Sequence, residues 1–327
     1  MNKTPSHVVT PIRPEVEVTV TDEQHLRAQV DTIMQAEEMT QSELARQVGI
    51  ASSTLSQWMS GKYGARTDKL VAAVQKWVAD YLQRKQRGDM PTAPDFIMTP
   101  TAKRISGALD YARSAGDIVL VYGGAGVGKT STIIHYQRTH PNVWHLQISP
   151  ATSSVMSLLE EIASAVGIVG YVRNRAALQR EIVKRMAGTR GLLVIDEAQH
   201  LGVVALEQLR YFTDSLDIGM VLCGNVFVAS QFTAGSKGAY LDRLSSRVGM
   251  RVHIKSSLQA DIEAIIDAWG FTDEKCRAHA RDIGKKPGAL RSLNKCFSLA
   301  TNYANARGKA MCCSDLNRAA KELGLFE

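Results

Sequence analysis

The chain has 327 residues, of which 45% are hydrophobic and 22% are charged, so we expect two or three globular domains. No uninterrupted apolar run approaches the ~20 residues that cross a bilayer, which argues against a membrane protein. The formal net charge of +7 permits binding to nucleic acid without establishing it. Residues 1–90 carry 11 basic and 11 acidic side chains, so the excess lies further along the chain.

The first 20 residues contain three prolines and no hydrophobic signal core, which predicts a flexible leader on a cytoplasmic protein. The five cysteines show no paired CxxC spacing, as expected in a reduced compartment. Cys276 and His279 have a metal-like spacing, but no second pair accompanies them. Helix packing is the better interpretation of that pair.

Residues 21–88 are predicted to be entirely helical, and they contain the stretch "MTQSELARQVGIASSTLSQWMSGKY" at 39–63. A capping box of Thr40 and Glu43 opens one helix, and Gly49 provides a turn before the next. This is the spacing of a helix-turn-helix, and it resembles Cro/repressor-type DNA-binding domains. The outward-facing residues of the second helix are the candidate DNA contacts: Ser52, Ser53, Ser56 and Gln57.

The chemistry of this second helix limits what it can contribute to DNA affinity. Gln57 can read adenine, but no Arg or Lys precedes Lys62, so the phosphate contribution should be modest. The alternative is a helix-turn-helix used for protein contacts or for regulating a filament.

A proline-containing linker is predicted at residues 89–100, and residues 101–256 then alternate between helical stretches and short apolar strands. This alternation predicts an α/β fold with a mostly parallel sheet. Residues 257–327 return to helix. The predicted strands cover 118–122, 143–148, 192–196, 219–224 and 251–254.

The segment "IVLVYGGAGVGKTST" matches the phosphate-binding pattern G-x-x-x-x-G-K-T between a strand and a helix. Such a loop wraps phosphate with backbone N–H groups at a helix N-terminus. Lys129 would reach the β- and γ-phosphates, and the Thr130 hydroxyl would bind Mg²⁺. The predicted nucleotide-binding residues are Gly123, Gly124, Ala125, Gly126, Val127, Gly128, Lys129, Thr130 and Ser131.

The segment "GLLVIDEAQHL" places two acidic residues at the end of a buried strand. Asp196 would hold the Mg²⁺ shell, and Glu197 would polarise the attacking water. A Glu directly after the Asp favours a hydrolase over a passive nucleotide binder. "NKCF" at 294–297 lacks the Asp of the guanine-reading motif, so ATP is the better choice of nucleotide.

With these two motifs about 65 residues apart and a helical C-terminal region, the chain resembles the AAA+ ATPases. The resemblance implies a sensor role for Asn225 in "GMVLCGN", and a second sensor at Arg291 in "KPGALRSL". It also implies an arginine finger at Arg247 in "SSRV", with Arg243 as the alternative. The competing interpretations are a turn cap for Asn225 and solvated surface charges for the arginines.

Together, "IDEAQHL" and the N-terminal helix-turn-helix resemble the transposition ATPases of the AAA+ class. That resemblance implies a phage protein of the bacterial cytoplasm that binds double-stranded DNA in an ATP-dependent, largely non-specific way. It further implies self-assembly into a helical filament or ring, and delivery of the DNA to a transposase that stimulates hydrolysis. A finger acting in trans would make ATP drive this assembly.

A basic segment at 171–190 supplies a second set of candidate DNA contacts, led by Arg173 and Arg175. A solvated basic face is the alternative. Two other functions remain open: a helicase-loader-like AAA+ ATPase, and an ATP-sensing helix-turn-helix transcriptional regulator. Glu197 argues against the regulator, because a passive switch needs no acid that activates water.

Overall fold

The computed structural model describes residues 20–87, 96–170, 174–233 and 245–326. The chain divides into two compact units, Met1–Asp89 and Met90–Glu327. None of the described helices combines the length and the apolar character needed to cross a membrane.

The N-terminal unit consists of four helices around a core that includes Leu44, Leu55 and Trp58. The capping box forms as expected, since the Thr40 hydroxyl accepts from the Glu43 amide and the Glu43 carboxylate accepts from the Thr40 amide. Gly49 has φ 80°, the left-handed conformation that ends the first helix of the motif. The helices are α1 (Val20–Ala36), α2 (Gln41–Val48), α3 (Ser52–Met59) and α4 (Asp68–Arg87).

A carboxylate links α1 to α3 and to the turn before α4. Glu23 of α1 accepts hydrogen bonds from Arg27 at 2.9 Å, from the Trp58 indole at 3.3 Å and from Thr67 at 2.5 Å. The fully buried Trp58 side chain thereby ties α3, the recognition helix, to α1. The predicted helix-turn-helix is confirmed.

The second unit is built on a five-stranded sheet in the order β2-β3-β4-β1-β5, in which every neighbouring pair is parallel. The three central strands are almost entirely apolar and buried, as buried parallel strands require, whereas the two edge strands carry exposed and polar residues. The predicted α/β fold is confirmed. The strands are β1 (Ile118–Gly123), β2 (Val143–Gln147), β3 (Leu192–Asp196), β4 (Gly219–Gly224) and β5 (Val248–Ile254).

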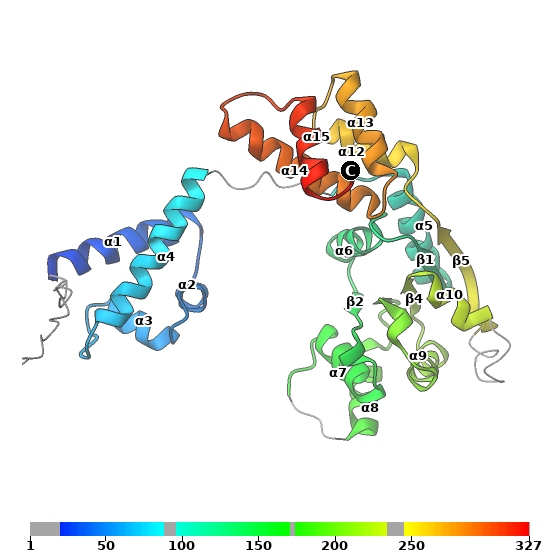
Figure 1. Ribbon diagram of the computed structural model, residues 1–327. Helices are drawn as coiled ribbons and strands as arrows, with labels where there is room; N and C mark the ends of the chain where they lie inside the picture. The colour runs from blue at the N-terminus through cyan, green and yellow to red at the C-terminus, as the bar shows by residue number, and fades with distance from the viewer. Residues whose placement is uncertain (1–19, 88–95, 171–173, 234–244, 327) are drawn as a thin grey trace, which may run out of the picture. The chain divides into compact units, whose positions relative to one another are not determined.

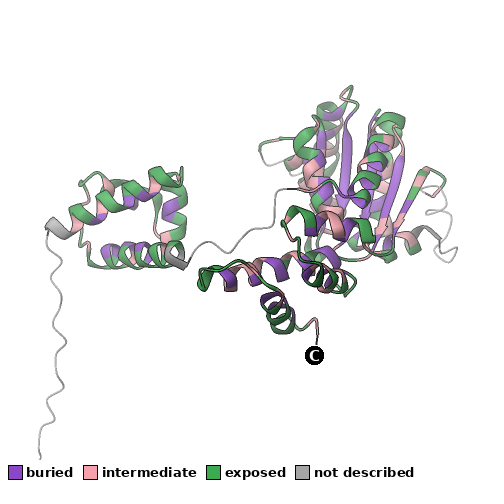
Figure 2. Cartoon of the chain, turned by 90° about the horizontal axis from the view of Figure 1, so that it is seen from above, coloured by how far each residue is buried: buried purple, intermediate pink, exposed green. Residues whose placement is uncertain are grey.

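Helices cover both faces of the sheet, and the strands lie buried between them (Figures 1 and 2). One face packs against α5 (Pro100–Ala115) and α6 (Lys129–Thr139). The other face packs against α7, α8, α9 and α10, whose bounds are Val155–Ala165, Arg175–Met186, Val203–Ser215 and Val226–Thr233. Two short 3₁₀ turns, η1 (Pro150–Thr152) and η2 (Ala198–His200), connect elements on this side.

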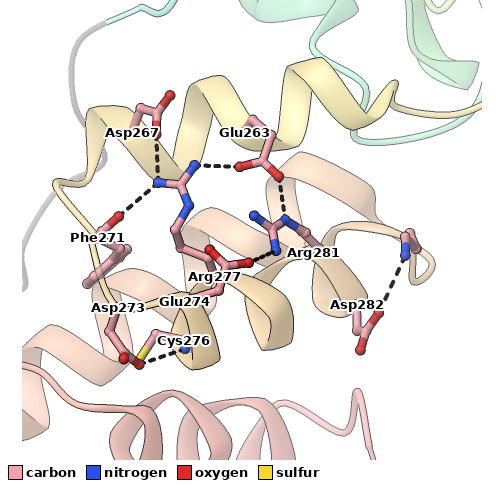
Figure 3. A network of polar contacts seen from close by, with 10 residues as sticks. Glu263, Asp267, Phe271, Asp273, Glu274, Cys276, Arg277, Arg281 and Asp282 are labelled. Atoms are coloured by element: carbon pink, nitrogen blue, oxygen red, sulfur yellow. Dashed lines mark hydrogen bonds and ion pairs between the residues drawn. The ribbon is translucent and has the colours of Figure 1, made fainter.

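A helical lid follows β5 and has its own apolar core, centred on Phe297 and Leu293. Arg277 and Arg281 tie its first two helices together, because both bind Glu263 and each binds a further carboxylate (Figure 3). The helices are α12 (Gln259–Ala268), α13 (Glu274–Gly284), α14 (Ala289–Ala306) and α15 (Cys313–Glu322).

Two contacts join the lid to the sheet layer. The fully buried carboxylate of Asp261 accepts from the Thr101 amide at 2.8 Å and from the Thr101 hydroxyl at 2.5 Å, at the start of α5. Gly288, which precedes α14, lies against the loop after β1, and a side chain at Gly126 would collide with the Gly288 carbonyl. The lid is therefore in direct contact with the predicted phosphate loop.

Cys276 and His279, the cysteine–histidine pair of α13, contact different neighbours. Cys276 is buried beside Asp273 and Cys313, whereas the His279 ring stacks on Phe326 with centroids 5.1 Å apart. Burial raises the pKa of the Cys276 thiol well above its ordinary value, which disfavours the thiolate that binds metals. His279 thus packs against Phe326, while the ligand atoms of Asp273, Cys276 and Cys313 lie within 4.8 Å of one another.

Candidate nucleotide-binding and catalytic site

The predicted phosphate loop opens onto a cavity of about 1100 Å³ at the carboxyl ends of the sheet strands. This is the edge at which parallel α/β sheets bind their ligands. The loop and the start of α6 form its floor, Glu197 and Asn225 approach from β3 and β4, and Arg291 with Lys295 approach from α14 of the lid. Residues from widely separated parts of the chain thus meet in one cavity.

Gly126 and Gly128 have φ values of 76° and 95°, which side-chain-bearing residues rarely adopt. Gly128 caps α6 without any side-chain hydrogen bond, so the amides of the first turn point toward the cavity side of the loop. The Lys129 ammonium donates to the carbonyls of Gly123 at 3.1 Å and Gly124 at 2.6 Å. The loop therefore presents backbone amides and a cation together, which is the chemistry of a phosphate site.

Thr130 and Asp196 meet beside this loop. The Thr130 hydroxyl donates to Asp196 Oδ2 at 2.6 Å, and Asp196 is only 1% exposed. Burial raises the pKa of Asp196, but the nearby His145 and the hydrogen bonds from Thr130 and the Glu197 amide lower it by more. The net effect is a pKa below the ordinary value, so the carboxyl is ionised at neutral pH.

His145 of β2 faces the same carboxylate. Its buried Nε2 lies 3.9 Å from Asp196 Oδ2, beyond hydrogen-bond length, and has no hydrogen-bond partner among the described residues. The hydroxyl and carboxylate oxygens of Thr130 and Asp196 are the hard donors that Mg²⁺ prefers. These residues fit the predicted metal.

Glu197 follows Asp196 and lines the cavity. Its backbone has φ 56° and ψ 35°, a left-handed conformation that costs a non-glycine residue on the order of 1 kcal/mol. Its carboxylate accepts a hydrogen bond from the Gln199 side chain of η2. Strain held at a cavity-lining acid is typical of functional sites.

Asn225 lies at the end of β4 and also lines the cavity. Its Oδ1 accepts from the Phe227 amide at 2.9 Å, so it caps α10 as the alternative interpretation anticipated. That contact uses only the Oδ1 acceptor of Asn225. The Nδ2 group of the same side chain can therefore still donate in a sensor role. The cap and the sensor interpretations are therefore compatible.

The two predicted arginines differ in position. Arg291 lines the cavity from the lid, whereas Arg247 is 59% exposed and pairs with Asp214 of α9 at 3.2 Å. Arg247 is not among the residues that line the cavity of its own chain, as a finger acting in trans would require. Arg243 lies outside the described residues.

The candidate DNA contacts lie in both units. Arg175, at the start of α8, is exposed, and so are Arg180 and Lys184 of the same helix. Arg173 lies outside the described residues. On α3, the exposed residues are Ser52, Ser53, Ser56 and Gln57.

No local sequence pattern marks the roles of His145, Gln199 and Asp261. Gln199 stands only three residues after Asp196, but one of its partners, the Asn225 amide, follows a different strand. In the sequence, His145 is a single polar residue within an apolar strand, and Asp261 is a single acidic residue near the start of a helix. Their significance depends on tertiary neighbours that no local pattern encodes.

A parallel sheet with a phosphate loop after β1, an acidic pair after β3 and a helical lid over the cavity defines the AAA+ class of P-loop proteins. The family models agree with this assignment. Residues 112–231 match an AAA domain, residues 32–75 match a helix-turn-helix, and residues 246–323 match the C-terminal part of the Mu B transposition protein.

The chain belongs to the family of Mu-type B transposition proteins. It is 36% identical over 300 residues to the ATP-dependent target DNA activator B of Escherichia phage Mu, covering 92% of this chain and 95% of that protein. It is also 36% identical over 265 residues to the Mu-like prophage FluMu DNA transposition protein B of Haemophilus influenzae, covering 80% of this chain and 91% of that protein.

A solved structure supports the fold alone. A chain of the Drosophila ORC bound to DNA aligns with a TM-score of 0.50 at 17% identity, over 74% of this chain and 65% of that chain. The AAA+ architecture is thus shared with a protein of very different sequence.

Proposed function

We propose that the chain is an AAA+ ATPase that hydrolyses ATP, binds target DNA when ATP is bound, and presents that DNA to a transposase. The observation that carries the proposal is the convergence of Lys129, Thr130 and Glu197 with Arg291 in one cavity between the sheet and the lid. The relatives that cover nearly the whole chain are named as ATP-dependent target DNA activators, which supports the DNA and transposition parts.

The residues have distinct parts in the proposed reaction. The amides after Gly126 and the Lys129 ammonium bind the phosphates, and Thr130 with Asp196 would hold Mg²⁺, which neutralises phosphate charge when bound. Glu197 accepts the proton of the attacking water. Asn225 orients that water, and Arg291 contacts the phosphates from the lid.

Assembly follows from the position of the proposed finger. Arg247 is exposed and away from its own cavity, so it serves the cavity of a neighbouring copy. Nucleotide bound between copies then favours a filament or ring on DNA, because binding stabilises the assembled state by mass action. DNA contacts come from exposed basic residues such as Arg175, together with the helix-turn-helix.

The test is the Glu197→Gln variant of the full chain with ATP and double-stranded DNA. We expect its hydrolysis rate to fall by at least about 100-fold, because the general base is lost, while nucleotide binding persists. The variant should therefore stay on DNA after wild-type protein has released it. Normal hydrolysis by Glu197→Gln would reject the catalytic assignment.

Electron microscopy of the wild-type chain with ATP and DNA separates this proposal from the two alternatives. Filaments along the duplex support target capture for transposition. Discrete hexamers would indicate a helicase-loader-like ATPase, and dimers on one preferred site would indicate a transcriptional regulator.

A further inference from the structure

One polar residue next to the catalytic acid has no part in the proposed reaction so far. Gln199 lies on η2, the single turn that follows Glu197. The left-handed conformation of Glu197 reverses the chain, so the Gln199 side chain returns toward the carboxyl ends of β3 and β4.

Both ends of the Gln199 amide are engaged there. Its Nε2 donates to the Glu197 carboxylate, and its Oε1 accepts from the Asn225 backbone amide at 3.3 Å. One side chain thus bridges the acid at the end of β3 and the residue that follows β4.

The neighbouring strand leaves room for this bridge at one position. A Cβ at Gly224 would lie against Gln199 Oε1 and against the Val228 side chain. Gly224 has no side chain, so the amide can approach the β4 backbone closely. A glycine and a glutamine in separate motifs therefore fit one another.

The bridge completes a continuous polar chain across the sheet edge. Thr130 donates to Asp196, the Glu197 amide donates to Asp196, and Gln199 links Glu197 to Asn225. A carboxylate on a strained turn has several rotamers available. The Gln199 donor selects one of them, with the carboxylate directed along this edge of the cavity.

We propose that Gln199 is a positioning residue for hydrolysis: its amide N–H orients the Glu197 carboxylate, and its carbonyl fixes that orientation to the end of β4. The inference rests on the proposed ATPase function. Gln199 does not line the cavity and is not itself a catalytic residue.

Two variants of the full chain separate the donor from mere packing. Gln199→Leu keeps the volume and removes both hydrogen bonds. Gln199→Glu keeps the shape and the acceptor for the Asn225 amide, and it replaces the donor by a carboxylate. A packing role tolerates Gln199→Leu, whereas an orienting role does not; Gln199→Glu tests the donor and also adds a charge that repels Glu197.

The measurement is steady-state ATP hydrolysis in the presence of DNA, with nucleotide affinity measured separately by a fluorescent ATP analogue. We expect both variants to lower kcat by about 10- to 100-fold, the effect of a misplaced catalytic group, with nucleotide affinity within about threefold of wild type. Gln208→Leu is the matched control. The Gln208 side chain of α9 makes a comparable contact, because its Nε2 donates to Gln179 Oε1 of α8 at 3.1 Å. This control variant should leave kcat within about twofold.

Each other result overturns the inference. Wild-type kcat in Gln199→Glu would show that the donor is not needed, and a parallel loss of nucleotide affinity in both variants would indicate a structural role only. Glu197→Gln, measured alongside, identifies failure of the proposed function. If Glu197→Gln or the wild-type chain contradicts that function, the inference falls with it; if only the Gln199 variants behave as wild type, the inference alone fails.

Discussion

The two units of the chain contain two kinds of surface. The cavity of residues 90–327 joins side chains from widely separated parts of the chain, beside buried and hydrogen-bonded groups such as Asp196. The recognition helix of the N-terminal unit instead presents short exposed polar side chains from one continuous stretch, with no basic residue among them.

This difference between the two surfaces indicates different roles for the two units. A site that holds an acid, a cation and a strained turn in fixed positions is suited to chemistry, whereas serines and a glutamine on an exposed face are suited to weak, adjustable contacts. We therefore predict that the cavity unit controls DNA binding and that the helix-turn-helix makes an auxiliary contact.

The largest expected effect comes from Lys129→Ala. Removing the cation that bridges the loop carbonyls should lower ATP affinity and hydrolysis by at least about 100-fold, since a charged partner of the phosphates is lost. Isothermal titration with ATP and a phosphate-release assay measure the two effects. Lys295→Ala, at the lid side of the same cavity, is the matched control and should cost far less. Equal losses of ATP affinity and hydrolysis in the two variants would contradict a specific role for the Lys129 ammonium.

The next effect concerns the buried carboxylate that joins lid and sheet. Asp261→Ala leaves the Thr101 amide, the Thr101 hydroxyl and the Leu258 amide without their acceptor, so we expect a loss of about 3 kcal/mol in the unfolding free energy of the second unit. Urea unfolding followed by tryptophan fluorescence checks this prediction. Asp282→Ala, whose carboxylate is largely exposed, should change little.

Glu23→Ala is the counterpart in the N-terminal unit. Its carboxylate accepts from Trp58 and Thr67, so its loss should destabilise the helix-turn-helix and leave the second unit unchanged. If either variant destabilised both units equally, the division into two separate structures would be wrong.

Acid should weaken the lid by a smaller amount. Burial raises the pKa of Asp315, but Arg307 and the Cys312 amide lower it by more, to below its ordinary value. The unfolded chain then binds a proton at a higher pH than the folded chain, so this stabilisation is complete at neutral pH and is lost as pH falls below about 4. Thermal unfolding at pH 7 and at about pH 2.5 measures the loss. Asp315→Asn should flatten the difference, and Asp282→Asn should leave it unchanged.

The smallest effect is expected on the recognition helix. Ser53→Ala combined with Gln57→Ala should change affinity for mixed-sequence DNA by less than about threefold, since neither residue supplies phosphate charge. Arg175→Ala with Arg180→Ala should weaken binding more and reduce its salt dependence. Fluorescence anisotropy at two salt concentrations compares them, and a larger loss in the serine–glutamine variant would reverse the roles of the two units.

The sequence could predict what is encoded locally. The strands at 192–196 and 219–224 match their predicted bounds, because apolar β-branched runs between turns have few alternatives. The phosphate loop and the acidic pair were found because each is contiguous and each follows a strand. Parallel strands then bring both to the same edge of the sheet.

Pairings between distant residues could not be predicted in this way. The fold decides which side chains meet. It pairs Arg247 with Asp214, leaves the buried His145 Nε2 without a hydrogen bond among the described residues, and lets Gln199 reach the Asn225 amide. The polar–apolar pattern assigns these residues to a surface or to a strand, and it carries no information on their partners.

The most direct test of the central claim is the DNA affinity of residues 90–327 alone, measured with ATP and with ADP. This unit has its own sheet and lid cores, so it can be prepared without the helix-turn-helix. We predict that ATP strengthens its binding to mixed-sequence DNA by at least about tenfold over ADP. Loss of DNA binding in this unit, or equal affinity with the two nucleotides, would contradict the claim that the cavity controls when DNA is held.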